Sequence, residues 1–140
     1  MDSADDVAAR NKERQRLFVE VLQEQGEIDR VDEFVRPDFE NHTGRPGSPP
    51  GPDGVRQGLA LFRAGFPDHG AEVVHMVAEG DLVATYKTFT GTHTGDFLGI
   101  PATGKQATIR VMDIVRYRDG RIAEHWSVVD LAGARAQLEA

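Results

Sequence analysis

Apolar and polar residues alternate most regularly in residues 107–130, which read ATIRVMDIVRYRDGRIAEHWSVVD. A period of two places successive side chains on opposite faces of a β-strand. The dipeptide Asp119-Gly120 interrupts the alternation, and this pair is typical of a tight hairpin turn. The segment is therefore predicted to form two antiparallel strands joined by a turn at residues 118–120.

One face of the first predicted strand is apolar except for a single carboxylate. This face carries Ala107, Ile109, Val111, Asp113, Val115 and Tyr117. In the second strand one face carries Ala123, His125, Ser127 and Val129, and the other carries Ile122, Trp126 and Val128. If the first two sets share a face, an acid, an imidazole and a hydroxyl converge on an apolar surface. A buried carboxylate costs free energy unless it is paired, so Asp113 belongs either to a structural ion pair or to a site with a tuned pKa.

The first half of the chain has the spacing of apolar residues that is typical of helices. We expect helices at residues 6–25, 28–35 and 52–66, the last opening on a proline that suits a first turn. Residues 40–43 are expected to be a short extended or irregular piece. Residues 44–54, GRPGSPPGPDG, have the composition of a loop. A loop of this length without structure of its own is often a lid, so we expect it to be mobile and to border a pocket.

Further strands are expected at residues 71–79 and 82–93, followed by a Gly/Pro-containing loop at 94–104 and a short helix at 131–138. Three helices followed by at least four antiparallel strands predict an α+β fold with helices on one face of a curved sheet. Such a cone encloses an apolar pocket. The length suits one hydrophobic core, so residues 1–140 are expected to form one domain.

Composition narrows the range of partners. The net charge of −7 argues against nucleic acid or an anionic membrane surface as a partner. The absence of cysteine excludes disulfides and thiolate nucleophiles. No apolar run approaches the roughly 20 residues of a membrane span, and the acidic first residues do not resemble a secretory signal. A cytoplasmic protein is expected, and no phosphate-binding glycine motif is present.

Four segments carry a resemblance to a known family. GTHTGDFLGIPATGK at 91–105 and MDIVRYRDGRIAEHWSVVD at 112–130 resemble the SnoaL-like polyketide cyclases, as do FPDH at 66–69 and FENH at 39–42. The resemblance extends over essentially the whole chain. It implies the nuclear-transport-factor-two-like cone fold, usually a homodimer, which ketosteroid isomerase, scytalone dehydratase and limonene epoxide hydrolase share.

The resemblance also implies roles for particular residues. Aldol cyclases of this family work without a cofactor, and an Asp on the last strand, two positions after a His, acts as acid/base. Here that His matches His125, and the position of the Asp holds Ser127. The family's His on the preceding strand matches Asp113, and a His that is common in the GTHTG segment matches His93.

We therefore expect a cofactor-independent cyclase or isomerase that acts on a hydrophobic polyketide-type molecule by acid/base catalysis. Asp113 is the expected acid/base, His125 its partner and His93 a further catalytic group. The expected substrate contacts are Asn41, His42, Phe18, Phe39, Phe62, Phe66, Tyr86, Phe97 and Ser127. Several of these have simpler readings, since aromatic residues in a small domain are often plain core and Asn41 and His42 can cap backbone groups. No metal is expected, because no motif supports a site at His93, Asp113 and His125.

Two other functions remain open at this point. One is epoxide opening by an activated water, which requires two carboxylates and an arginine, whereas Asp113 and Arg110 alternate to opposite faces of their strand. The other is a non-catalytic small-molecule binding protein. For the cyclase and for both alternatives we expect a homodimer through the outer face of the sheet, where Met112, Ile114, Trp126 and Val128 form an apolar patch.

Overall fold

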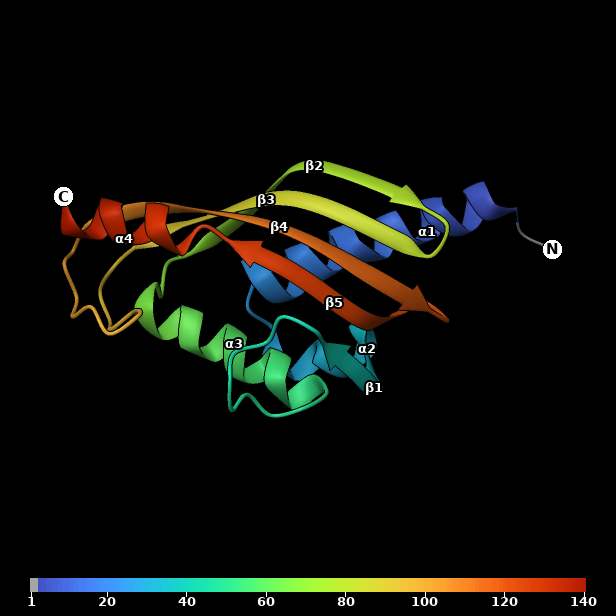
Figure 1. Cartoon of the computed structure of the whole chain (residues 1–140), viewed down its shortest axis with the longest axis horizontal. Helices are drawn as coiled ribbons and strands as arrows, with labels where there is room; N and C mark the ends of the chain where they lie inside the picture. The colour runs from blue at the N-terminus through green and yellow to red at the C-terminus, as the bar shows by residue number, and fades with distance from the viewer. Residues whose placement is uncertain (1–2) are drawn as a thin grey trace.

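The computed structural model describes residues 3–140, and it has the α+β architecture predicted from the sequence (Figure 1). One five-stranded sheet has the order β1-β5-β4-β3-β2. Neighbouring strands are antiparallel except β1 and β5, which are parallel. The strands are β1 (Val35–Asn41), β2 (Gly70–Glu79), β3 (Leu82–Thr92), β4 (Gln106–Arg118) and β5 (Arg121–Val129).

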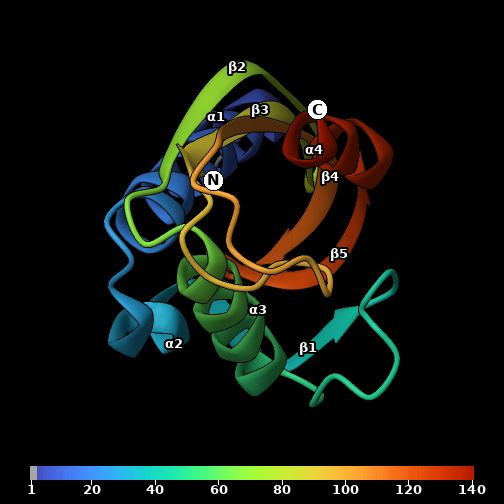
Figure 2. The same cartoon turned by 90° about the vertical axis from the view of Figure 1, so that its left-hand side faces the viewer.

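The helices lie against this sheet and around its ends. Helix α1 packs on β2 and β3, and α4 packs on β4. Figure 2 shows the sheet curling from β2 to β5, with α3 on the open side of the curl. The helical segments are α1 (Ala4–Phe18), the π-helix η1 (Val19–Glu24), the 3₁₀ turn η2 (Ile28–Arg30), α2 (Val31–Phe34), α3 (Pro52–Gly65) and α4 (Leu131–Glu139). Within residues 3–140, no helix is long and apolar enough to cross a membrane.

The first helix begins earlier than predicted and changes type before it ends. Ser3 Oγ accepts a hydrogen bond from the Asp6 N–H, and the Asp6 carboxylate accepts one from the Ser3 N–H. This reciprocal capping box satisfies two backbone donors and fixes the start of α1 at Ala4. The last six residues, Val19–Glu24, wind as a π-helix, which is frequent at functional sites.

The prediction for residues 28–43 is corrected by the structure. The second helix ends at Phe34, and Val35–Asn41 form a strand that starts earlier than the extended or irregular piece expected at residues 40–43 and includes its first two residues. Pro37 lies within this strand, which β1 tolerates because it is an edge strand with one neighbour and an irregular register between Val35 and Glu40. The strand pairs Asn41 with His125, and it leads into the 44–54 loop, whose mobility stays a prediction.

The β4–β5 hairpin confirms the predicted alternation. Inward-facing buried residues alternate with more exposed residues along the whole of β4. Asp113 lies directly opposite Ser127, and Val115 lies opposite His125, so the two predicted faces do share one side of the sheet. A break in register between Arg116 and Tyr117 shifts the end of the hairpin, however, and Ile122 is only 2% exposed. The prediction that Ile122 lies on the outer face is therefore wrong, because one bulge moves a side chain to the other face.

The hydrophobic core consists of two clusters that meet at one position of β4. Val115 and Tyr117 belong to the cluster beneath α1 and α2. Ile109 and Val111 belong to a second cluster with residues of α4. Asp113 falls between them on the same inward face, so a carboxylate occupies the middle of the core.

We expect the π-helix to be a stabilising part of the first cluster. Leu22 is 1% exposed, whereas Leu61 on α3 is 48% exposed. Leu22→Ala should lower the free energy of unfolding by about 2–5 kcal/mol, because it removes buried methyl groups and leaves a cavity. Leu61→Ala should change it by less than about 0.5 kcal/mol. Urea denaturation of both variants checks this, and equal losses would contradict it.

Candidate active site

The carboxylate in the middle of the core is paired with a lysine. Lys87 Nζ lies 2.6 Å from Asp113 Oδ2, and the two side chains are 2% and 1% exposed. Lys87 Nζ also donates to Gln23 Oε1 at 2.9 Å. The rings of Phe18 and Phe89 lie beside the ammonium, with centroids 6.0 Å and 5.7 Å away. Lys87 and Asp113 thus form a buried ion pair, and the lysine has one amide partner and two aromatic rings beside it.

The register of β3 and β4 creates this pair. Thr85 lies directly opposite Asp113, and Lys87 lies opposite Val111, so Lys87 is the diagonal neighbour of Asp113 on the inner face. Sequence reasoning missed Lys87. The available signal was the alternation of LVATYKTFTGT, in which Lys87 shares a face with Val83, Thr85 and Phe89. A charge on the apolar face of a strand is the same signal that identified Asp113.

Several polar atoms around the pair remain without partners. In the part of the chain that the structure describes, neither Asp113 Oδ1 nor Thr85 Oγ1 has a hydrogen-bond partner. Tyr117 Oη donates to Gln15 Oε1 at 2.6 Å, which leaves Gln15 Nε2 unpartnered among the same residues. Burial raises the pKa of Tyr117, and the nearby Asp113 charge adds to this. Buried polar groups are normally satisfied, so unpaired acceptors and a donor here favour a site that receives polar groups of a ligand.

His125 is held by the edge strand. Its Nδ1 lies 3.0 Å from Asn41 Oδ1, and the same oxygen accepts the Thr43 N–H at 3.1 Å. Because this oxygen is an acceptor, His125 Nδ1 carries the hydrogen and Nε2 keeps its lone pair. Burial lowers the pKa of His125 to about 4, with Asp113 opposing and Lys87 assisting this change. His125 is therefore neutral at pH 7, and the cationic partner of Asp113 is Lys87.

His93 does not join this group. It follows β3, eight residues beyond Thr85, and at 3.3 Å per residue it is about 26 Å along the strand from the position opposite Asp113. There it stacks on Phe66 at 5.4 Å, and its Nδ1 accepts the Thr103 N–H at 3.2 Å. The structure thus places His93, which was expected to be a further catalytic group, far from Asp113 and His125. Among residues 3–140, no group of three or more His, Cys, Asp or Glu side chains is arranged to hold a metal ion.

The predicted substrate contacts separate into three places. Phe18 lies beside Lys87, and the Phe39 ring lies 6.4 Å from His125. The rings of Phe62, Phe66 and Phe97 contact one another in a separate cluster within the second half of the core. Tyr86 lies on the outer face, opposite Met112. Ser127 lies opposite Asp113 across the strands, with its Oγ 3.4 Å from Thr43 Oγ1.

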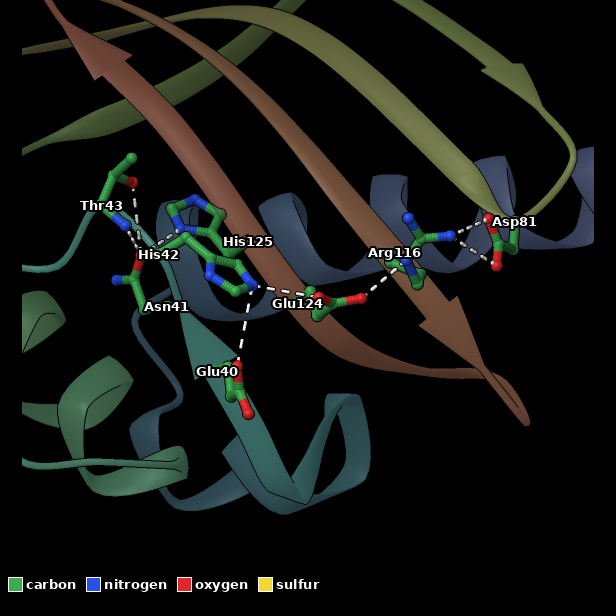
Figure 3. A network of polar contacts seen from close by, with 8 residues as sticks. All are labelled: Glu40, Asn41, His42, Thr43, Asp81, Arg116, Glu124 and His125. Atoms are coloured by element: carbon green, nitrogen blue, oxygen red, sulfur yellow. Dashed lines mark hydrogen bonds and ion pairs between the residues drawn. The ribbon is translucent and has the colours of Figure 1, made fainter.

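His42 belongs to a polar network rather than to the surroundings of Asp113 (Figure 3). Its ring stacks on Trp126 at 4.7 Å, and its Nε2 lies 3.0 Å from Glu124 Oε1. Glu124 in turn contacts Arg116 at 2.6 Å, and Arg116 contacts Asp81 at 2.8 Å. The neighbouring residue Asn41 instead contacts His125, so the last residue of β1 and the residue that follows it belong to two different groups of contacts.

The outer face of the sheet is hollowed by an apolar groove. A cavity of about 510 Å³ is lined mainly by residues of β2 to β5, among them His75, Val77, Tyr86, Met112, Trp126 and Val128. Val128 is 75% exposed and Met112 is 61% exposed. The predicted outer patch is therefore present, and it lies on the opposite side of the sheet from Lys87.

Many enzymes with different activities share an α+β cone fold, so the fold and the buried Lys87–Asp113 pair do not by themselves define the activity. Comparison with known proteins identifies the family. Residues 12–138 match the model of the SnoaL-like polyketide cyclases. The chain belongs to this family, and it is an enzyme of that class.

Two similar proteins are both named as methyl ester cyclases. The nogalonic acid methyl ester cyclase of Streptomyces nogalater is 31% identical over 115 residues, which cover 81% of this chain and 86% of that protein. The aklanonic acid methyl ester cyclase DnrD of Streptomyces peucetius is 26% identical over 116 residues, covering 81% of this chain and 80% of that protein.

Solved structures agree with the fold. TsrD from Streptomyces laurentii superposes with a TM-score of 0.84 at 28% identity, over 93% of this chain and 95% of that one. IdmH from Streptomyces antibioticus gives 0.82 at 33% identity, over 93% of this chain and 99% of that one.

The low pKa of His125 predicts a defined pH dependence. Because the unfolded chain protonates this ring near pH 6.5 and the folded protein only near pH 4, the unfolded state binds more protons in between. The stability contributed by neutral His125 is therefore complete above pH 6.5 and is lost as the pH falls toward 4. NMR titration of the ring should give a midpoint near pH 4. Stability should fall less steeply between pH 6.5 and 4 in His125→Gln, and parallel curves would contradict the assignment.

Proposed function

We propose that the chain, as a single domain of residues 1–140, closes a carbon ring in a hydrophobic polyketide ester, with Asp113 as the acid/base. The observation that carries this proposal is the unpartnered Oδ1 of Asp113, a carboxylate oxygen on an otherwise apolar buried face, among the residues that the structure describes. The names of the two relatives support a polyketide methyl ester as substrate.

The proposed chemistry is an intramolecular aldol reaction. Asp113 Oδ1 takes a proton from a carbon next to a carbonyl, and the electron pair of that C–H bond moves to the carbonyl oxygen to form an enolate. The enolate carbon then attacks a second carbonyl of the same molecule. Asp113 returns the proton to the new alkoxide, so the product is an isomer of the substrate and the reaction consumes no co-reactant. A positioned general base contributes about 10²- to 10⁴-fold to such a step.

The position of the carboxylate fits the family pattern with one displacement. The resemblance places the acid/base Asp at Ser127, and Asp113 lies directly opposite Ser127 on the adjacent strand. Adjacent strands are about 4.8 Å apart, and both side chains belong to the same face of the sheet. The carboxylate is thus moved by one strand within the same site.

His125 and the nearby aromatic residues have supporting parts in this proposal. Neutral His125, fixed through Asn41, offers Nε2 as an acceptor for a hydroxyl group of the substrate. Phe18 and Phe39 provide apolar surface near Lys87 and His125. Flat aromatic polyketides suit such walls, because aromatic rings stack favourably.

Epoxide hydrolysis is not favoured by the geometry. That chemistry requires an arginine and a second carboxylate around one water with Asp113. Arg110 instead pairs with Asp130 at 2.7 Å, on the outer side of β4. The cation at Asp113 is Lys87, and no second carboxylate contacts this pair in the described part of the chain.

The acid/base role predicts a selective loss of turnover. Asp113→Asn should lower turnover of nogalonic acid methyl ester by about 10²- to 10⁴-fold, because the amide cannot carry the proton. Asp38→Asn is the matched control, since Asp38 is an exposed carboxylate paired with Arg36 at 2.9 Å on the edge strand, and it should retain full activity. Circular dichroism checks that both variants fold. Full activity of Asp113→Asn would overturn the mechanism, and activity that appears only in Ser127→Asp would favour a binding protein.

We also propose a homodimer through the outer apolar groove. A contiguous exposed apolar surface marks an interaction site, and the resemblance implies a homodimer, whose two-fold contact is self-complementary. Met112→Glu should shift the protein toward monomer, because each copy would bury a charge at the interface. Leu61→Glu on α3 should leave the mass unchanged. Light scattering at micromolar concentration measures this, and a monomeric parent protein would contradict the proposal.

A further inference from the structure

We propose that Lys87 is a second catalytic residue, whose ammonium stabilises the enolate oxygen at the moment when Asp113 accepts the proton. This inference rests on the proposed function, and it adds that the substrate must present a carbonyl oxygen beside the carbon that loses its proton.

The contacts of Lys87 leave one donor of its ammonium unused by the described residues. An ammonium has three donors. One contacts Asp113 Oδ2 at 2.6 Å and one contacts Gln23 Oε1 at 2.9 Å. No third oxygen contact of Lys87 is present among residues 3–140, and its other close neighbours are the Phe18 and Phe89 rings. In the proposal, this third donor is the one that binds the enolate oxygen.

The pair also has the right arrangement for adjacent atoms of a carbonyl compound. Lys87 contacts Oδ2 of the carboxylate, while Oδ1 is the oxygen without a partner in the described chain. The base atom and the ammonium therefore lie on neighbouring sides of one carboxylate. A carbonyl oxygen at Lys87 places the adjacent carbon toward Oδ1.

Charge balance is the physical reason for the role. Before reaction, the buried site holds the Lys87 cation and the Asp113 anion, which neutralise each other. Proton transfer makes Asp113 neutral, and an ammonium at 2% exposure would then be unpaired, which is strongly unfavourable for a buried charge. The enolate formed in the same step supplies the missing anion. Negative charge thus moves from one partner of Lys87 to another, and the site stays neutral throughout.

The π-helix η1 fixes the position of Lys87 for this exchange. The Gln23 side chain accepts from Lys87, while its backbone carbonyl lies 2.6 Å from His69 Nε2. Gln23 thereby links the lysine to a second fixed side chain. When Asp113 becomes protonated, Gln23 still holds the ammonium, so the donor remains oriented toward the new oxyanion. Electrostatic stabilisation by such fixed donors is usually a large contribution to catalysis.

The test uses equilibrium binding of an enolate mimic, para-nitrophenol, whose phenolate form is yellow and whose neutral form is not. Asp113→Asn reproduces the neutral aspartic acid that exists after proton transfer, with Lys87 left uncompensated. At one fixed pH this variant should bind the phenolate form at least about tenfold more tightly than the parent protein does, because its cation has no anion. The double variant Lys87→Met/Asp113→Asn contains no buried charge and should lose this preference. Visible absorbance and calorimetry measure the form bound and the affinity.

The outcomes separate the two proposals. A tenfold gain in Asp113→Asn that disappears in the double variant supports Lys87 as the oxyanion donor. Absence of phenolate preference in Asp113→Asn, or its survival in the double variant, overturns this role and leaves Lys87 as a structural counterion. Neither result depends on turnover. If Asp113→Asn loses ester cyclisation but does not prefer phenolate, the proposed function stands and the role of Lys87 is rejected. If Asp113→Asn keeps ester cyclisation and does prefer phenolate, Asp113 is rejected as the base.

Discussion

The buried ion pair of Lys87 and Asp113 is the constraint on which the rest of the interior depends. Two opposite charges at 2.6 Å inside a core are tolerable only while both remain, because removal of one partner typically costs about 3–5 kcal/mol. The register of β3 and β4 must therefore keep them adjacent, and η1 must bring Gln23 to the ammonium. The two hydrophobic clusters on either side hold these elements in place.

Helix α1 carries buried polar residues that lower the stability of the core. Its buried residues are Asn11, Gln15 and Phe18, so two of its three buried positions carry amides. An apolar residue at Gln15 would bury more hydrophobic surface, but Tyr117 would lose the acceptor of its hydroxyl. Buried polar groups of this kind reduce stability unless they are fully satisfied. The amide nitrogen of Gln15, which has no partner among residues 3–140, thus reduces local stability, as is common at functional sites.

The sequence was informative where structure is local and uninformative where it depends on distant pairing. The β4–β5 hairpin and the inward position of Asp113 follow from period-two alternation and one turn, and both were predicted. Strand β1 was missed because it contains Pro37 and pairs in parallel with a strand about 85 residues later in the chain. The alternation of β3 places Lys87 on the inner face and was overlooked, whereas its pairing with Asp113 depends on the register of β3 and β4, which the sequence does not show. His93 was grouped with Asp113 because the sequence does not show distance along a strand.

Strand β1 has a consequence for how the site holds together. It is an edge strand with an interrupted ladder to one neighbour, and such elements open locally at lower free energy than central strands. Asn41 on this strand fixes the ring of His125, whereas Lys87 and Asp113 belong to the two central strands β3 and β4. The contact that fixes the imidazole therefore depends on an edge strand, whereas the ion pair depends on internal strands of higher local stability. Fluctuations that release the imidazole leave the buried charges in place, so the site can loosen on its polar side without exposing its charged centre.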